Sequence, residues 1–222
     1  MPEPITPTEY WAFQKAYDFF NAELFSGALP HVLVTLQRRA RSSGYFAPER
    51  FAGRARSNLS TTAHELALNP DNFKGHADRD ILATLTHEMV HAWQQTHGKP
   101  DCSYHDRQWA AKMKEIGLHP SATGEPGGKE TGKHMSHYIV SGGPYAQAYQ
   151  KLQASGFELG WESRPFEKQQ KAKRASKTKF TCPGCGQNAW AKPDAKLICG
   201  AWHEDGEGVR VLASRLMLAE PE

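Results

Sequence analysis

Long hydrophobic runs are absent from this chain, which has no stretch of about 18 apolar residues and so no expected membrane-spanning helix. The first residues lack the basic flank and apolar segment of a secretory signal, so we expect a cytoplasmic protein. Charge of one sign is also scarce: 27 Lys and Arg against 24 Asp and Glu leave a net charge of +3, too small to indicate nucleic-acid binding by itself. The 222 residues can form one sizeable core with a small appendage, or two small domains.

Cysteine is scarce as well, with four residues in the whole chain. Four cysteines could form two disulfides, but Cys182 and Cys185 have the spacing of a metal knuckle. Because the chain looks intracellular, metal binding is favoured over disulfides. Cys102 lies far from the others in the sequence, and we expect it to be a free thiol.

The cysteines near the C-terminus predict a small zinc-ribbon-like module. Cys199 follows the knuckle after a gap close to that of a two-knuckle ribbon. A second knuckle would need cysteine where Trp202 stands, but the neighbouring His203 would complete a Cys3His site with Cys182, Cys185 and Cys199. This zinc is expected to be structural, because a ribbon has too little core to fold without its metal. The alternative is a degenerate ribbon that binds metal weakly or not at all.

Residues 87–91 read His-Glu-Met-Val-His and lie in a stretch whose apolar spacing predicts a buried helix. His87 and His91 are four residues apart, so both imidazoles project from one helical face and can reach a single metal ion. Glu88 then lies beside the open coordination position, where a carboxylate can take a proton from bound water. The pattern predicts a catalytic zinc, and the alternatives are a structural metal site or a pair of surface histidines.

The third zinc ligand has several candidates. His97 has the metzincin spacing from His91, but that pattern needs a glycine where this chain has Gln94. The six helical steps from His91 to His97 turn through about 600°, which leaves His97 about 120° away from the direction of His91. His105 fits better, because it begins the next predicted helix after a loop long enough to reverse the chain. The other candidates that stay open are Glu115, His119, His134 and His137.

The expected fold is α+β: a small sheet packed on helices, with the His-Glu-Met-Val-His segment on a zincin-like active-site helix. Thr6 and Glu9 have the spacing of a capping box at the start of the first helix. The strand at 64–68 comes just before the motif helix and is a candidate edge for holding extended substrate. The expected helices are 7–25, 78–97, 106–116 and 144–155, the expected strands are 32–36, 44–47 and 64–68, and 121–133 is an expected loop.

The strongest charge run spans residues 164–179, with seven Lys and Arg against the single acid Glu167. It predicts a flexible basic linker at 161–180, between a main domain at 5–160 and the zinc-ribbon-like module at 181–222. A ribbon tethered by such a linker favours a polyanion partner, in particular DNA or another nucleic acid. The alternative is a solvated linker with a ribbon that docks on protein.

Over residues 5–120 the sequence resembles the SprT-like (Spartan-type) metalloprotease family. The third zinc histidine of that family begins the motif His-Gly-x-x-Phe, and residues 105–109, His-Asp-Arg-Gln-Trp, occupy that place. Asp106 and Trp109 depart from the motif, as Trp202 departs from the last ribbon cysteine. The other matching segments, in family order, are Phe20-Asn21, Leu24-Phe25, Leu29-Pro30, Gly44-Tyr45-Phe46 and Leu85 to Trp93.

The resemblance implies a zinc-dependent endopeptidase associated with DNA, from a family whose members degrade proteins crosslinked to DNA and often carry a C-terminal zinc ribbon. Glu88 would remove a proton from the attacking water and later protonate the leaving amine. Tyr104 or His137 is a candidate for stabilising the oxyanion. Two other interpretations stay open: a non-catalytic nucleic-acid-binding zinc protein, and a zinc peptidase with no DNA role. The expected ligands of the catalytic zinc are His87, His91 and His105.

Overall fold

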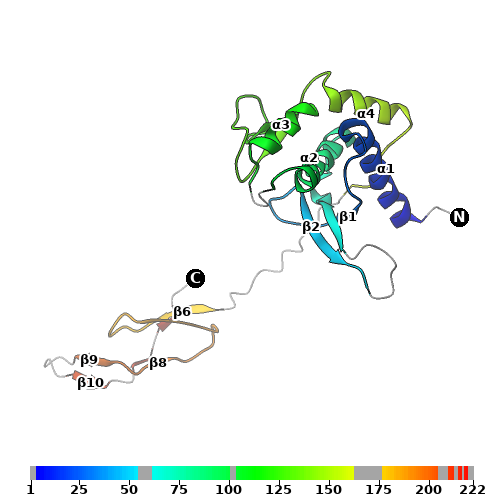
Figure 1. Cartoon of the computed structure of the whole chain (residues 1–222). Coiled ribbons are helices and arrows are strands. Elements are labelled where there is room, and N and C mark those ends of the chain that lie inside the picture. Colours follow the sequence, from blue (N-terminus) through cyan, green and yellow to red (C-terminus); the bar gives the residue numbers. More distant parts are fainter. Residues whose placement is uncertain are drawn as a thin grey trace. The chain divides into compact units, whose positions relative to one another are not determined.

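The structure, a computed structural model, describes residues 4–54, 62–100, 104–162, 177–204, 210–212, 215–216 and 218–219. The chain divides into two compact units, Met1–Pro165 and Phe166–Glu222 (Figure 1). Most of the segment expected to be a basic linker lies outside the described residues, and so does Cys102. No helix in the described parts of the chain is both long and apolar enough to cross a membrane.

The four expected helices are all present in the first unit. They are α1 (Ile5–Phe25), α2 (Asp78–His97), α3 (Arg107–Glu115) and α4 (Pro144–Ala154). The start of α1 differs from the prediction, because the helix already includes Thr6 and its N-cap residue, Pro4, makes no side-chain hydrogen bond. Glu9 does not close a capping box either, and it is buried with 7% of its surface exposed. The capping-box prediction is therefore wrong.

A three-stranded sheet lies against these helices, which makes the unit α+β as expected (Figure 1). Its strands are β1 (Val32–Leu36), β2 (Gly44–Ala52) and β3 (Thr62–Leu68), in the order β1-β3-β2. β1 runs parallel to β3, and β2 runs antiparallel to β3 with an irregularity between Ala47 and Phe51. β3 is therefore the central strand, so the prediction that it forms a free edge for substrate is wrong. Within the described sheet, β2 is the edge strand that reaches α2.

A short hairpin follows α3 and was not predicted. β4 (Leu118–Ser121) pairs antiparallel with β5 (Ser136–Ile139), and His119 lies opposite Tyr138 while Pro120 lies opposite His137. The expected loop at 121–133 is the connection between these strands, apart from Ser121, which ends β4. The hairpin returns the chain toward α2, and this places His137 in the site described below.

The core of the first unit is aromatic where α1 meets the rest. Phe13, Tyr17 and Phe20 are almost completely buried, and the ring of Phe20 stacks on that of Tyr145 in α4 at 5.4 Å. The Tyr145 hydroxyl donates to the Arg79 carbonyl at 2.6 Å, which ties α4 to the first turn of α2. Burying each such ring stabilises the fold by about 1.5–3 kcal/mol. The packing of α1 and α4 therefore holds α2 in place on the side opposite its histidines.

The second unit consists of short strands with a very small core. β6 (Thr178–Thr181) pairs antiparallel with β7 (Asn188–Ala191) and with β12 (Leu218–Ala219). The remaining pairs are β8 (Ile198–Cys199) with β11 (Arg215–Leu216), and β9 (Trp202–Glu204) with β10 (Arg210–Leu212). Among the side chains that the structure describes there, the buried core consists of Phe180, Cys182 and Cys199, which is too little apolar surface to stabilise a fold without a staple such as a metal.

Candidate metal centre

Helix α2 presents His87 and His91 toward one open side of the first unit. The helix forms because Leu85 and Met89, both completely buried, fix its apolar face in the core. The two histidines lie one turn apart with ring centroids 5.5 Å from each other. His87 is 7% exposed, so its ring is held among packed side chains and not in solvent.

His105 joins them from a different part of the chain, immediately before α3. Its backbone pairs with Gly132 in an isolated bridge, with the His105 N–H donating to the Gly132 carbonyl at 2.9 Å. The His105 Nδ1 is 3.1 Å from the same carbonyl oxygen, which can only accept, so Nδ1 carries the proton. This tautomer leaves Nε2 of His105 free to bind a metal.

The loop that carries His105 is held by Asp106 and Gln94. Asp106 caps α3 by accepting a hydrogen bond from the Trp109 N–H at 2.8 Å. Buried Gln94 donates from Nε2 to the same Asp106 oxygen at 2.9 Å. Gln94 occupies the position where a metzincin helix turns at glycine, so here the helix continues and Gln94 holds the following loop from its side.

The ligand atoms of His87, His91 and His105 all lie within 4.8 Å of one another. Trp109 packs beneath all three rings and is completely buried. Its ring centroid lies 4.9 Å from that of His87, 5.6 Å from that of His91 and 4.4 Å from that of His105. The larger ring of Trp109, compared with phenylalanine in the family motif, therefore serves as the floor of the site.

His137 is the neighbour of His87 that sequence reasoning had left among several candidates. It comes from β5, and its Nδ1 lies 3.1 Å from Nδ1 of His87. When His87 offers Nε2 to a metal, its Nδ1 carries the proton and donates it to His137. The sequence shows His137 only as one more histidine, fifty residues after His87. Its contact with His87 depends on the pairing of β4 with β5, which the sequence did not predict.

Glu88 is buried beside the triad and has a closely fitted surrounding. Burial raises the pKa of its carboxyl to about 8, although the backbone N–H of Phe46 in β2 donates to it and favours the ionised form. A side chain at Gly44 would place a Cβ 3.2 Å from Cγ and Oε1 of Glu88 and 2.9 Å from the Ala67 carbonyl. The backbone of β2 thus approaches Glu88 directly, and a cation held by the histidines would return the carboxyl to its ionised form.

The chemistry of the donor set fits zinc. Burial lowers the pKa of His91 to about 3 and also lowers the pKa of His87 and of His105, with mutual repulsion among the rings adding to the effect. The three imidazoles are therefore neutral at physiological pH, the form in which histidine binds a metal. Three neutral imidazoles with a carboxylate that is not needed as a ligand match the ligand set of catalytic zinc.

Three of the remaining sequence candidates, His97, His119 and Glu115, lie away from the triad. The ring of His97 stacks on that of Trp93 at the end of α2, with centroids 6.2 Å apart. His119 stacks on Tyr138 and faces Glu130, and Glu115 pairs with Lys112 on α3. These three residues do not belong to the group of ligand atoms around His87, whereas Tyr104 and His134 line the same cleft as the triad.

The triad and Glu88 open into a cleft of about 660 Å³. β2 contributes Gly44, Tyr45 and Phe46 to its lining, and the connection into β5 contributes residues 133–137. The triad and Glu88 can therefore be reached through the cleft, and the edge strand β2 borders the cleft. A closed structural site would have no such opening.

The second unit holds a separate cysteine cluster. The Sγ atoms of Cys182, Cys185 and Cys199 lie within 4.8 Å of one another, and those of Cys185 and Cys199 are 3.6 Å apart. The knuckle turn is closed by the Gly186 N–H, which donates to the Cys182 carbonyl at 2.9 Å, and Gly186 has a φ of 70°. The Cys185 backbone N–H lowers the pKa of Cys182 and favours the thiolate that binds metal. The prediction on His203 falls on a side chain outside the described residues.

Comparison with known proteins gives two matches. The model of the SprT-like family matches residues 13–127, more than half of the chain, and this range includes the three histidines and Glu88. A protein of Salmonella typhimurium, described as an uncharacterized protein in the mucB 3′ region, is 55% identical over 49 residues. That match covers 22% of this chain and 66% of the relative, slightly less than two thirds of its length. No solved structure matches the chain.

Proposed function

The chain belongs to the SprT-like family, and we propose that it is a zinc-dependent endopeptidase that acts on DNA-bound or DNA-crosslinked proteins. The observation that carries the proposal is the convergence of His87, His91 and His105 from two separate segments beside the buried Glu88. A purely structural site would need a fourth protein ligand. Within the described residues the metal-ligating group has three members, which leaves one position open toward the cleft.

Each side chain has a definite task in the proposed reaction. Zinc, when bound, polarises the substrate carbonyl and lowers the pKa of water in the cleft. Glu88 accepts the proton from the attacking water and later gives it to the leaving amine. The Phe46 N–H keeps the Glu88 carboxylate oriented for this transfer. The two candidates for stabilising the oxyanion, Tyr104 and His137, both line the cleft, and His137 also lies 3.1 Å from Nδ1 of His87.

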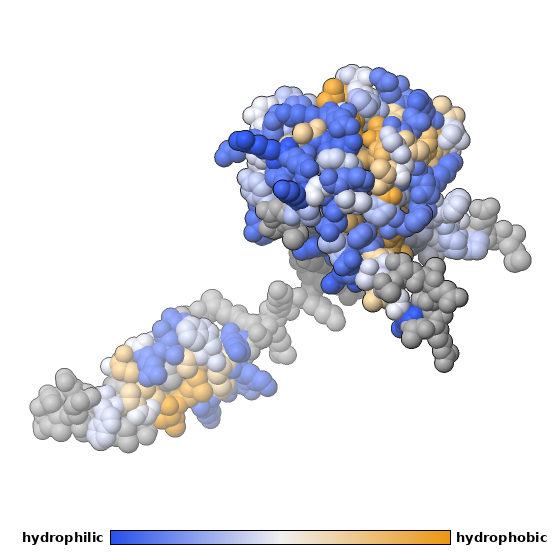
Figure 2. Space-filling model, viewed as in Figure 1, coloured by the Kyte–Doolittle hydropathy of each residue, from blue (hydrophilic) through white to orange (hydrophobic). Residues whose placement is uncertain are grey.

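The DNA part of the proposal rests on the second unit. In the β6–β7 pair, Lys179 lies opposite Trp190, so the two side chains share a face of the hairpin. Trp190 and Trp202 are 61% and 60% exposed, and apolar residues gather on the visible face of this unit (Figure 2). Exposed tryptophan beside lysine is the combination that stacks on unpaired bases and holds phosphates. The seven cations of residues 164–179 would add to this attraction.

The decisive experiment combines metal analysis with cleavage of a DNA-binding protein, with and without single- and double-stranded DNA. The wild-type protein should contain zinc at the histidine site and cleave. Glu88→Gln should keep that zinc and lose at least about 100-fold in kcat, because the base is gone while the ligands remain. Proteolysis retained by Glu88→Gln would refute the mechanism. Cleavage that does not respond to DNA, with no salt-sensitive DNA binding, would leave a peptidase without a DNA role.

A further inference from the structure

The cleft has an unusual charge distribution at its opening. Arg39 and Arg41 line it from the β1–β2 connection, and Lys133 lines it from the connection into β5. Among the described residues that line the cleft, Glu88 is the only carboxylic acid. The whole chain is nearly balanced in charge, so the lining of the cleft is more cationic than the chain as a whole.

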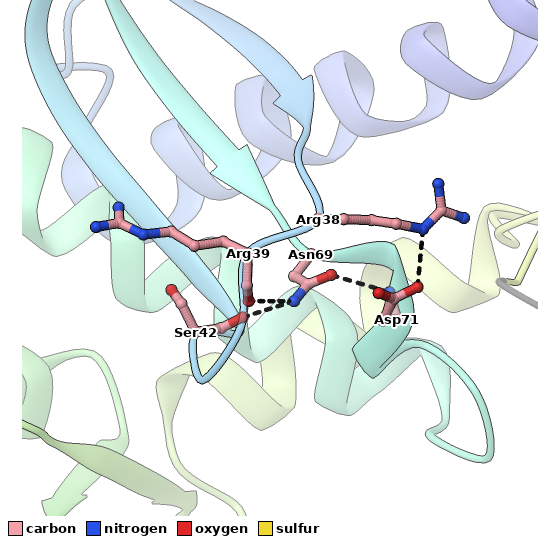
Figure 3. A network of polar contacts seen from close by, with 5 residues as sticks. All are labelled: Arg38, Arg39, Ser42, Asn69 and Asp71. Atoms are coloured by element: carbon pink, nitrogen blue, oxygen red, sulfur yellow. Dashed lines mark hydrogen bonds and ion pairs between the residues drawn. The ribbon is translucent and has the colours of Figure 1, made fainter. Parts of the chain in front are cut away.

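The connection that carries the two arginines is held in one conformation by Asn69 (Figure 3). The Asn69 Nδ2 donates to the carbonyls of Arg39 and Ser42, both at 2.9 Å, and its N–H donates to the Ser43 carbonyl at 2.8 Å. Asn69 is 6% exposed, and its own Oδ1 accepts from the Asp71 N–H at 3.1 Å. Because the anchoring contacts are to backbone carbonyls, the arginine side chains are not needed to hold the loop.

Neighbouring arginines on this loop have different surroundings. Arg38 and Arg39 extend in opposite directions in Figure 3, and Arg38 forms an ion pair with Asp71 at 2.9 Å. Arg39 instead places its guanidinium 5.2 Å from the centroid of the Tyr45 ring. The Tyr45 hydroxyl donates to buried Glu65 at 3.0 Å, which fixes this ring as a platform. Arg39 is thus held on the wall of the cleft.

The rim cations, which we define as Arg39, Arg41 and Lys133, form no ion pair with any described residue. An exposed cation is ordinarily solvated and carries no function. Here three of them line the hollow that also contains Glu88, where the substrate chain must lie. A carboxylate in that chain would therefore meet unneutralised guanidinium and ammonium groups, which bind carboxylates well.

We propose that the rim cations are a subsite for acidic side chains, so that the enzyme prefers substrates with Asp or Glu close to the cleaved bond. This inference rests on the proposed peptidase function and names its substrate class. A peptide is favoured over a nucleic acid because the cations line the cleavage cleft itself. A nucleic acid needs a longer row of cations along its phosphates than three side chains provide.

The size of the preference follows from the exposure of these groups. Each exposed charge pair changes affinity by about two- to fivefold, so two or three pairs give a preference of about tenfold. The preference should weaken as salt is raised, because the Debye length falls from about 10 Å at 0.1 M to about 3 Å at 1 M.

The test uses an internally quenched peptide that the wild-type full chain cleaves, with Gln flanking the cleaved bond on both sides, and its Glu counterpart. We expect kcat/KM to be about tenfold higher for the Glu peptide. Arg39→Gln combined with Arg41→Gln should remove most of that preference and leave the Gln peptide within about twofold of wild type. Arg38→Gln is the matched control, because it removes a cation from the same loop without touching the cleft, and it should keep the preference.

A binding experiment separates failure of this inference from failure of the proposed function. Binding of both peptides to the zinc-loaded Glu88→Gln variant is measured by fluorescence anisotropy, without any cleavage. Tighter binding of the Glu peptide that is lost in the arginine variants supports the subsite even if no peptide is hydrolysed. Equal binding of both peptides overturns it. A single-stranded oligonucleotide that displaces the Glu peptide and binds only when the arginines are present would also overturn it, in favour of nucleic acid in the cleft.

Discussion

Replacing the His137 imidazole should weaken zinc binding, although His137 is not one of the expected zinc ligands but the partner of His87. In His137→Phe the Nδ1–H of His87, now 3.1 Å from an acceptor, would lose its partner inside a nearly buried pocket. A buried donor without a partner costs about 1–3 kcal/mol, and outer partners of zinc ligands are worth about 10–100-fold in metal affinity. The two magnitudes agree, because a 10–100-fold change in affinity corresponds to about 1.4–2.8 kcal/mol. We therefore expect the zinc dissociation constant at the histidine site to rise by that factor.

The assay is competition with a chromophoric chelator, supported by the visible spectrum of the cobalt-substituted protein, which reports the ligand field directly. His137→Gln offers an acceptor oxygen and should recover part of the affinity. His119→Phe is the control, because it lies on the other strand of the same hairpin and its ring stacks on Tyr138. Thermal unfolding of the metal-free proteins checks that the hairpin still folds. Wild-type zinc affinity and an unchanged cobalt spectrum in His137→Phe would refute the reasoning.

Two further predictions concern Gly44 and Glu9. Gly44→Ala would place a Cβ 3.2 Å from the Glu88 side chain and 2.9 Å from the Ala67 carbonyl. We expect the free energy of unfolding, measured with denaturant, to fall by about 1–3 kcal/mol. We also expect kcat to fall while zinc stays bound. Gly200→Ala, which adds a methyl group into open space, is its control, and normal turnover in Gly44→Ala would contradict the close fit. Burial raises the pKa of Glu9 above its usual 4.5, and repulsion from Asp78 adds to the shift. The folded state therefore holds the Glu9 proton more tightly than the unfolded state does. The contribution of Glu9 to the free energy of unfolding should fall as pH rises above about 4.5. Glu9→Gln should reduce that slope and stabilise the protein at neutral pH, whereas the exposed Asp18→Asn should not, and an unchanged slope in Glu9→Gln would contradict the assignment.

The sequence by itself determined the helix that carries the chemistry. The spacing of Leu85 and Met89 on one face and of His87 and His91 on another is a local property, because residues three or four apart meet on any helix whatever surrounds it. The rejection of His97 was equally local, since Gln94 continues the helix and the geometry of a continuing helix is known. The choice of His105 needed a loop that reverses the chain, and the structure brings that residue into the group with His87.

The tertiary structure decided what depends on residues distant in the sequence. Thr6 and Glu9 had the spacing of a capping box, but α1 begins before Thr6 and the Glu9 carboxyl is buried, because tertiary contacts outweigh a capping preference of about 1 kcal/mol. The order β1-β3-β2 could not be predicted from three short strands, and it made β2 the edge at the cleft. Only the β4–β5 pairing brings His137 to His87, and only the fold of the β1–β2 connection turns Arg39 toward the cleft and Arg38 away. Local periodicity places His87 and His91 on one face of a helix, whereas the residues that orient and surround them come from chain reversals that no local pattern encodes.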